Sequence, residues 1–340
     1  MNSTDIPLEL SIVVIGRNEG ERLAACLASV AAADLGGLPA EVIYVDSAST
    51  DGSTALAREM GARVIVVQPA RPCAAVGRNA GWRAARGRLV LFLDGDTLLD
   101  PAFVPAALAE LHSSPRIAAV WGHRRERFPE ASVFNRVLDL DWVYPPGDSE
   151  FCGGDALFRR NVLVAAGGFD ESLIAGEEPE LCARLRAVGF RISHIDHLMT
   201  RHDLAMNNWS QYWRRAERAG HAYAEISERT RDGEVPLWQD ESRRNRIRGS
   251  ALLAAPLVLA SLLAAGAMLP VLAAVGAALL LLARTAWRAR WKGGDTLTLA
   301  LYAAHSHLQQ VPILWGQLAW RFAQRRGKAR PLIEYKAVPR

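Results

Sequence analysis

The chain has 340 residues and a formal net charge of +4; half of its residues are hydrophobic and 22% are charged. This composition excludes a disordered chain and allows one large α/β domain with an appendage, or two modest domains. The basic residues gather at both ends of a long apolar run rather than forming a stripe with aromatic residues. That pattern argues against a nucleic-acid partner and favours a membrane surface.

Cysteine usage and the first residues bear on the cellular compartment. The four cysteines form no CxxC pair and lie far apart (Cys26, Cys73, Cys152 and Cys182). We therefore expect neither structural zinc nor a disulfide framework, but buried or idle thiols in a reducing cytosol. The opening MNSTDIPLEL has no basic start followed by an apolar core. We expect no signal peptide, and a catalytic part that stays in the cytoplasm.

The first hundred residues alternate between short apolar runs and helical patterns. Strands are predicted at 10–15, 41–45, 62–67 and 89–93, and helices after the first strand, at 53–60 and at 79–85. The helix after the first strand is indicated by apolar residues at helical spacing (Leu23, Cys26, Leu27 and Val30). This alternation predicts an α/β fold with a parallel sheet covered on both faces, where ligands bind beyond the carboxyl ends of the strands. Residues 101–235 mix helical segments with glycine- and proline-rich loops.

The segment Gly249–Ala283 contains no charged residue. At about 35 residues it is too long for one membrane crossing of about 20. We predict two short helices joined near Pro270, forming a hairpin that spans the membrane or is re-entrant; a buried helical pair of a soluble protein is the alternative. Basic residues on both sides place both ends in the cytoplasm (Arg243, Arg244, Arg246, Arg248; Arg284, Arg288, Arg290, Lys292).

A further amphipathic segment, residues 297–322, contains Trp315 and Trp320. Histidine and glutamine residues interrupt its apolar pattern. We expect it to lie in the membrane interface as one amphipathic helix, with a membrane crossing as the alternative.

The strand at 89–93 ends in Asp94-Gly95-Asp96. Two neighbouring carboxylates repel each other unless a cation lies between or beside them. Mg²⁺ and Mn²⁺ prefer oxygen ligands and bridge to phosphates, where they stabilise negative charge on a departing diphosphate. We predict a divalent metal site here; a solvated acidic turn is the alternative.

The first two strands also end in polar residues. Asp46 ends the second strand at the expected ligand edge, where it can accept hydrogen bonds from a base or ribose, while Asp51 or Ser53 can cap the helix that follows. The first strand runs into Gly16-Arg17-Asn18-Glu19-Gly20. The simple interpretation of this stretch is a helix N-terminus with an acid in its first turn.

Taken together, these stretches resemble the family 2 inverting glycosyltransferases with the GT-A fold. The likeness rests on Asn18-Glu19, on the run from Asp46 to Ser53, and on Arg78-Asn79-Ala80-Gly81 before the Asp-x-Asp strand, and it covers about residues 8–205. It implies a Rossmann-like, mostly parallel nucleotide-diphospho-sugar transferase sheet followed by membrane-associated helices. It also implies donor-binding residues at ten positions (Gly16, Asn18, Glu19, Asp46, Ser49, Arg78, Asn79, Asp94, Gly95 and Asp96).

The resemblance also points to a later acidic pair, Glu177-Glu178. Many relatives have Glu-Asp here, so Glu178 stands where the family has Asp, and a carboxylate is kept. Inversion by direct displacement needs a base for the acceptor hydroxyl. Glu178 is our first choice as base and Glu177 our second; alternatively, both acids only begin a helix at Pro179.

The resemblance places the acceptor near Gly153-Gly154-Asp155, where glycines allow a ligand to approach the backbone closely. Asp155 can contact an acceptor hydroxyl or serve as a cap. His202 is a candidate third metal ligand beside Asp94 and Asp96, or a structural histidine.

From the sequence we therefore expect a GT-A catalytic domain at 1–235 and a helical membrane-associated region at 236–340. The expected reaction transfers a sugar from a nucleotide-sugar donor to a lipid-linked or glycan acceptor at the cytoplasmic face of a bacterial inner membrane, with no nucleic-acid partner. Two alternatives are a non-catalytic nucleotide-sugar-binding scaffold and a nucleotidyltransferase. The latter needs a glycine-rich basic loop after the first strand, and residues 16–19 are a poor version of one.

Overall fold

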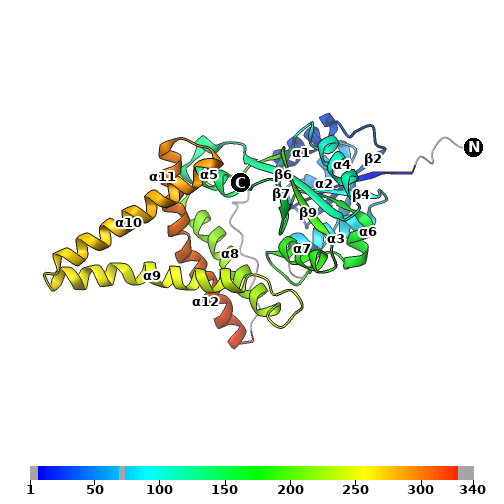
Figure 1. The fold of residues 1–340 in the computed structure, drawn as a ribbon. Coiled ribbons are helices and arrows are strands. Elements are labelled where there is room, and N and C mark those ends of the chain that lie inside the picture. Colours follow the sequence, from blue (N-terminus) through cyan, green and yellow to red (C-terminus); the bar gives the residue numbers. More distant parts are fainter. Residues whose placement is uncertain (1–6, 69–72, 328–340) are drawn as a thin grey trace, which may run out of the picture. The chain divides into compact units, whose positions relative to one another are not determined.

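A computed structural model of the chain describes residues 7–68 and 73–327, in two compact units (Figure 1). The first unit comprises residues up to 127 together with 144–203, and it contains an α/β sheet. The second comprises 128–143 and, among the described residues, 204–327, and it is helical. All four cysteines are buried free thiols in the first unit, as predicted.

The described residues of the first unit form one sheet in the order β3-β2-β1-β4-β8-β6-β9-β5, with β7 pairing to β9. β3, β2, β1 and β4 run parallel, as do β6 and β9, while β8 is antiparallel to both β4 and β6. The predicted α/β sheet is thus confirmed, as a mixed sheet with a parallel half. The strands are Leu10–Gly16 (β1), Ala40–Asp46 (β2), Arg63–Val66 (β3), Leu89–Asp94 (β4), Thr97–Leu99 (β5), Ile117–Glu126 (β6), Gly147–Ser149 (β7), Ala156–Arg159 (β8) and Arg191–His202 (β9).

Six helices accompany this sheet in the described part of the unit, and α1 buries the four residues whose spacing predicted it. Strands β1 and β4 are almost entirely buried, which explains their continuous apolar runs. The helices are Glu21–Ala32 (α1), Ser53–Glu59 (α2), Ala74–Ala84 (α3), Phe103–Ser113 (α4), Arg160–Ala166 (α6) and Glu177–Ala187 (α7).

Helix α3 begins at Ala74, five residues before the predicted start at residue 79. Gly77 and Gly81 made this helix harder to recognise in the sequence, and both are needed for its close packing on the sheet. A Cβ on Gly81 would lie 2.2 Å from Cγ1 of Val13, and one on Gly77 would lie 3.3 Å from Cγ2 of Ile15. This close contact places the end of α3 against the strands that lead to the site.

The second unit contains a close crossing of helices α8 and α12. A Cβ on Gly220 of α8 would lie 2.0 Å from the Ile313 carbonyl oxygen, and one on Gly316 of α12 would lie 2.1 Å from that of Glu217. Only glycine permits the two backbones to approach this closely. The helices are Pro129–Ala131 (η1), Val133–Asp141 (α5), Trp209–Arg229 (α8), Gln239–Ala264 (α9), Met268–Ala289 (α10), Arg290–Lys292 (η2), Thr296–Leu308 (α11) and Gln310–Arg325 (α12).

The apolar segment forms two helices, as predicted, but their junction and lengths differ from the prediction. α9 has 26 residues and α10 has 22, because both helices continue into the flanking basic segments. The turn lies at residues 265–267 and not at Pro270, which is the third residue of α10. Proline is tolerated in a first helical turn, whereas Gly266 supplies the left-handed backbone (φ 69°) that ends α9. Both helices are long and apolar enough to cross a membrane.

The segment expected as one amphipathic helix at 297–322 is two helices, α11 and α12, which meet at Gln309. Pro312 explains the break, because it has no N–H to donate to a carbonyl of the preceding turn. Helix α8 groups with these C-terminal helices in the second unit. The predicted functional boundary near residue 235 stays a prediction.

Candidate active site

The polar ends of β1, β2 and β4 lie at one edge of the sheet. β1 is the middle strand of the three, and its register pairs Gly16 with Asp46 on one side and Ile15 with Asp94 on the other. The backbone N–H of Gly95 donates to the Ile15 carbonyl at 2.8 Å, which continues the alignment past the end of β4. The sheet therefore brings four of the predicted donor residues to a common edge, namely Gly16, Asp46, Asp94 and Gly95.

Hydrogen bonds join the loops that follow β1 and β2. The backbone N–H of Asn18 donates to Ser49 Oγ, and the N–H of Thr50 donates to Asn18 Oδ1, both at 2.8 Å. Asn18 has a left-handed backbone (φ 55°), which asparagine tolerates better than most residues. The buried Asp46 carboxylate accepts from Tyr44 Oη at 3.0 Å and from the N–H of Ser49 at 2.8 Å. Asp46 and Asn18 thus fix the shape of this edge.

Three of the predicted donor residues lie close together where β1 and β4 end, namely Gly16, Glu19 and Gly95. A Cβ on Gly16 would lie 3.0 Å from Cγ of Glu19, and one on Gly95 would lie 3.1 Å from the Ile15 carbonyl oxygen. Glu19 forms an ion pair with Arg22 at 2.9 Å. A side chain at either glycine would therefore crowd its neighbours at this edge.

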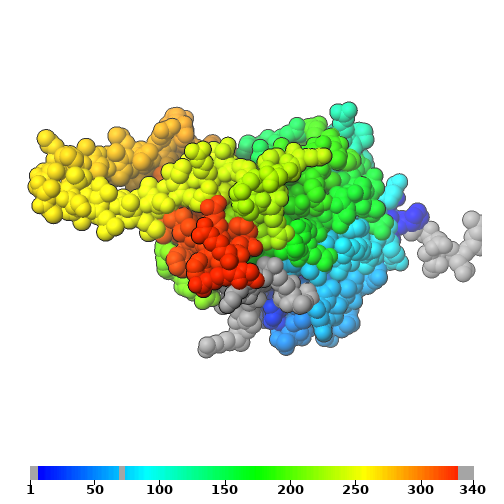
Figure 2. Space-filling model, turned by 90° about the horizontal axis from the view of Figure 1, so that it is seen from below, coloured from blue at the N-terminus to red at the C-terminus, as the bar shows by residue number. Residues whose placement is uncertain are grey.

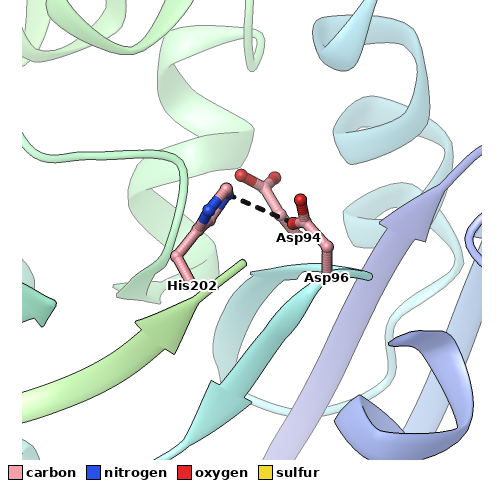
Figure 3. Close-up of side chains that lie close together, drawn as sticks. All are labelled: Asp94, Asp96 and His202. Atoms are coloured by element: carbon pink, nitrogen blue, oxygen red, sulfur yellow. Dashed lines mark ion pairs between the residues drawn. The ribbon is translucent and has the colours of Figure 1, made fainter. Parts of the chain in front are cut away.

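Asp94, Asp96 and His202 come together although they belong to different parts of the chain (Figure 3). Asp94 ends β4, Asp96 precedes β5, and the antiparallel pairing of Thr97 with His202 brings the imidazole alongside. One potential ligand atom from each of the three side chains lies within 4.8 Å of the others, and His202 Nε2 is 3.2 Å from Asp96 Oδ1. The predicted trio therefore converges.

Burial, together with the nearby Arg124 cation, lowers the pKa of His202 to about 4. The imidazole is then neutral at neutral pH and keeps a lone pair that a metal can use. Carboxylate oxygens with one imidazole nitrogen suit Mn²⁺, and the carboxylates alone also suit Mg²⁺. The donor set at this place fits a divalent cation.

Arg78 occupies the centre of the acidic cluster and is only 2% exposed. Its Nη2 is 3.0 Å from Asp94 Oδ1, and its Nη1 is 2.9 Å from Oε1 of both Glu177 and Glu178. One guanidinium therefore links the end of β4 to the first turn of α7. The resemblance had assigned Arg78 to the donor; the structure shows it in contact with three carboxylates of the chain.

The two glutamates differ in exposure. The side chain of Glu177 is 4% exposed and that of Glu178 is 17% exposed. Burial, followed by the neighbouring Glu177 charge, raises the pKa of Glu178 to about 7. A general base works best when its pKa lies near the operating pH. Both properties favour Glu178 over Glu177 as the group that meets an acceptor.

Asp155 is committed to the protein itself. Its Oδ1 accepts from the backbone N–H of Asp94, and its Oδ2 accepts from Arg124 Nη2 and Thr200 Oγ1, each at 2.9 Å. It holds the end of β4 in place from the neighbouring β8 side. A direct contact of Asp155 with an acceptor hydroxyl stays a prediction.

Gly153 and Gly154 permit the cluster to close. A Cβ on Gly154 would lie 2.4 Å from Arg78 Nη2 and 3.1 Å from Asp94 Oδ2, whereas one on Gly153 would lie 3.5 Å from Arg124 Nη2. Gly154 is therefore the position at which any side chain would displace Arg78. This requirement gives the predicted glycine pair a local physical reason.

Asn79 is buried and its amide is used inside the fold. Nδ2 donates to the Phe169 carbonyl and to Glu171 at 2.8 Å, while Oδ1 accepts from Trp82 Nε1 and from the N–H of Phe169. Asn79 thus anchors α3 to the segment before α7. The donor role that the resemblance implied for it stays a prediction.

The sequence analysis missed Arg124. It lies near the end of β6, 2.9 Å from Asp155 and 3.9 Å from Asp94. A basic residue inside a strand carries no local motif, and only the pairing of Arg124 with Thr200 of β9 brings it to the site. The guanidinium groups of Arg78 and Arg124 are outnumbered by the carboxylates of the cluster (Asp94, Asp96, Asp155, Glu177 and Glu178). This excess of negative charge favours a bound cation.

Comparison with known proteins agrees with this geometry. Residues 11–163 match the sequence model of the family described as Glycosyl transferase family 2. The chain is 24% identical over 178 residues to an O-antigen chain rhamnosyltransferase, WbaN, of Salmonella anatum, covering 48% of this chain and 56% of that one. It is 32% identical over 198 residues to a glucosyl-3-phosphoglycerate synthase of Mycolicibacterium smegmatis, covering 56% and 57%. The chain thus spans little more than half the length of these curated relatives.

Among solved structures, the fold is similar to that of a mannosyltransferase, PcManGT, from Pyrobaculum calidifontis in complex with GDP-Man and Mn²⁺. The two share 23% sequence identity with a TM-score of 0.61, and the likeness covers 88% of this chain and 87% of the other. It shows the shared fold. Residues 11–163 thus match glycosyltransferase family 2, and the chain shares the GT-A type of fold.

Proposed function

We propose that this chain transfers one sugar, with inversion, from a nucleotide-diphospho-sugar to a lipid-linked or polysaccharide acceptor. The observation that carries the proposal is the single cluster in which Arg78 joins Asp94 of the Asp94–Asp96–His202 group to Glu178. A site for a diphosphate and a base of suitable pKa thus lie side by side. That is the arrangement that a direct displacement requires.

At the donor end, Asp46 and the loop joined by Asn18 and Ser49 would hold the nucleoside at the edge of the sheet. Asp94, Asp96 and His202 would hold the divalent cation, which supplies positive charge to the departing diphosphate. The GDP-Man and Mn²⁺ of the similar mannosyltransferase support such a donor and cation. The choice of sugar and nucleobase depends on residues that line the donor, so the proposed donor is the whole class of nucleotide-diphospho-sugars.

At the acceptor end, the Glu178 carboxylate would take the proton of the acceptor hydroxyl as that oxygen bonds to the anomeric carbon. The bond from this carbon to the diphosphate oxygen breaks in the same step, and the nucleoside diphosphate leaves with the electron pair. Attack from the opposite side inverts the anomeric centre. Arg78 holds Glu178 beside Asp94, so the base and the leaving-group site keep a fixed spacing.

For the location, we propose the cytoplasmic face of a bacterial inner membrane. The support comes from α9 and α10, which expose apolar side chains along their length and have basic residues at their outer ends. The O-antigen chain assignment of one relative supports a lipid-linked or glycan acceptor.

The decisive experiment replaces Asp96 by Asn in the full chain. We expect transfer from the accepted nucleotide-sugar to fall by at least about a thousandfold, because a neutral amide neither holds the cation nor opposes its charge. Donor and cation would first be chosen by thermal shift with UDP-, GDP- and dTDP-sugars in the presence of Mn²⁺. Transfer would then be measured with membranes or extracted lipids as acceptor.

The matched control is Asp196→Asn, since Asp196 lies on β9 with its side chain 81% exposed and contacts only His123 among the described ion pairs. This variant should transfer normally. Undiminished turnover by Asp96→Asn would remove the proposed mechanism. Donor binding by the unchanged protein without hydrolysis or transfer under any condition would favour the non-catalytic scaffold instead.

A further inference from the structure

The turn between α9 and α10 is apolar at its tip. Residues 265–267 are Ala-Gly-Ala, and the two helices meet there and diverge toward the rest of their unit (Figure 1). The space-filling view shows the same end projecting from the other helices of the unit (Figure 2). Leu269, beside the tip, is 81% exposed. A water-exposed loop between two membrane-crossing helices would ordinarily carry polar residues, and this one has none.

The backbone at this tip satisfies its own hydrogen bonds. Gly266 donates to the Leu263 carbonyl at 3.0 Å and Ala267 donates to the Leu262 carbonyl at 2.9 Å, which is the pair of bonds of a Schellman motif. Ala265 donates to Ser261 at 3.0 Å. Each unsatisfied backbone group inside a bilayer is strongly unfavourable, so a closed motif of this kind suits hydrocarbon surroundings.

The start of α10 has the same property. Met268 donates to the Gly266 carbonyl at 2.9 Å and Val271 donates to that of Ala267 at 3.4 Å. Between them, Pro270 has no N–H that needs a partner. Ser261, the polar side chain nearest the tip on α9, donates its hydroxyl to the Leu257 carbonyl at 2.9 Å. The polar groups around the turn are therefore largely internally bonded.

Each whole helix is long enough to cross a membrane, but its uncharged part, here called an arm, is shorter than a full crossing. The uncharged part of each helix, 249–264 in α9 and 268–283 in α10, contains about 16 residues and rises about 24 Å at 1.5 Å per residue. The hydrocarbon core of a bilayer is about 30 Å thick. Arms of this length bring the tip deep into the bilayer without carrying it into water on the far side.

The ends of the two arms away from the tip, here called their bases, are both suited to one lipid surface. Exposed basic residues stand immediately outside the uncharged parts (Arg243, Arg244 and Arg248; Arg284, Arg288 and Arg290). Trp287 and Trp291 are 61% and 55% exposed just beyond the α10 arm, and the Arg290 guanidinium lies 4.3 Å from the Trp287 ring centroid. Tryptophan and arginine at this level are typical of the headgroup region, and the positive charge complements anionic lipids.

We propose that α9 and α10 form a re-entrant hairpin, whose Ala265–Ala267 tip stays inside the hydrocarbon of an anionic phospholipid bilayer while both bases lie at one membrane surface. This geometry deepens the membrane association proposed above and rests on it. It excludes a pair of full crossings with a loop in the opposite compartment. Pro256, which leaves the Leu252 carbonyl without its helical donor, is compatible with this arrangement because that carbonyl lies near the headgroup level.

The test uses single added cysteines in the full chain, because the four native cysteines are buried and give a low background. Ala267→Cys reports the tip and Glu234→Cys, at an exposed position in the loop before α9, reports the base. Both would be treated with a membrane-impermeant maleimide in right-side-out and inside-out vesicles. We expect Glu234→Cys to be labelled from one side only, and Ala267→Cys to be labelled from neither side until detergent is added.

Leu269→Cys repeats the tip measurement at a fully exposed side chain, should Ala267→Cys fail to accumulate. Labelling of either tip cysteine from the side opposite to Glu234→Cys would overturn the re-entrant geometry while leaving membrane association in place. Alkaline carbonate extraction separates the two proposals. Release of the protein by carbonate would overturn membrane insertion itself, whether the released protein is a single copy or copies paired through their hairpins. Retention of the protein together with a protected tip supports both membrane insertion and the re-entrant geometry.

Discussion

Charged residues are usually exposed and large apolar residues are usually buried. The acidic cluster of the first unit departs from the first rule, and the α9–α10 hairpin of the second unit departs from the second. Charged groups are buried in the cluster, where Arg78 is 2% exposed and Glu177 is 3% exposed. Large apolar groups are exposed on the hairpin, where Leu269 is 81% exposed and Leu280 is 73% exposed. Buried charges need partners, and extended apolar surface marks an interaction site.

The two regions differ in how they are stabilised. The cluster supplies most of its own partners, since two guanidinium groups offset several carboxylates and a cation would offset more of the remaining charge. Many large apolar side chains of the hairpin are exposed within the described part of its unit, which agrees with the membrane partner proposed above. Single substitutions should therefore act strongly in the cluster and weakly on the hairpin.

The largest effect is expected for Glu178→Gln. Loss of the general base should lower kcat by about 10²–10⁴-fold with a much smaller change in the donor KM. The matched control is Glu180→Gln, on the same helix, whose carboxylate pairs with Arg184 at 2.6 Å instead. Steady-state transfer assays of both variants decide the matter. Equal activities of the two would remove Glu178 from the role of base.

The same residue predicts a pH dependence. Only the deprotonated carboxylate accepts a proton, so kcat should fall about tenfold for each pH unit below about 7 and level off above it. The folded state favours the protonated form relative to the ordinary value of 4.5, so the contribution of Glu178 to stability decreases as pH rises from about 4.5 to about 7. A pH profile of kcat that stays flat between 5 and 8 would contradict this assignment.

The next effect concerns Arg78→Gln, which leaves three carboxylates of the cluster without their shared cation. We expect the free energy of unfolding to fall by about 3–5 kcal/mol, as for other broken buried ion pairs. Arg83→Gln is the control, because Arg83 lies on the same helix in an exposed pair with Glu171 and should contribute at most about 1 kcal/mol. Denaturant unfolding of both variants in detergent measures the difference, and similar midpoints would show that the cluster does not need its central cation.

A smaller effect compares the body of the second unit with the hairpin. Gly220→Ala places a Cβ 2.0 Å from the Ile313 carbonyl oxygen and should lower the free energy of unfolding by about 1–3 kcal/mol. Gly276→Ala, in α10 with nothing within 4 Å of its added Cβ, should be neutral or slightly stabilising. Thermal unfolding in detergent tests both. Equal losses would indicate that the hairpin is as tightly packed as the α8–α12 crossing.

The sequence predicted well what depends on short segments. Buried apolar runs ending in Asp46 and Asp94 indicated both the parallel strands and the edge at which their polar residues meet. It could not predict contacts made across long stretches of chain, such as the ion pair of Arg78 with Glu177, 99 residues away. Arg124 was not predicted for the same reason, because its contacts at the site are also made with residues far away in the chain. On the hairpin, Pro270 was the stronger local signal, yet Gly266 ends the helix because only its backbone adopts the required turn.

The long separations within the cluster also have a consequence for biosynthesis. Asp94 depends on Asp155, 61 residues later, and the nearby His202 ends the last strand of the sheet. A chain that is still emerging from the ribosome therefore lacks the cation site until this strand has been made and has paired. The ion would act on the finished fold, slowing its opening, and would contribute little to the early steps by which the nascent domain forms.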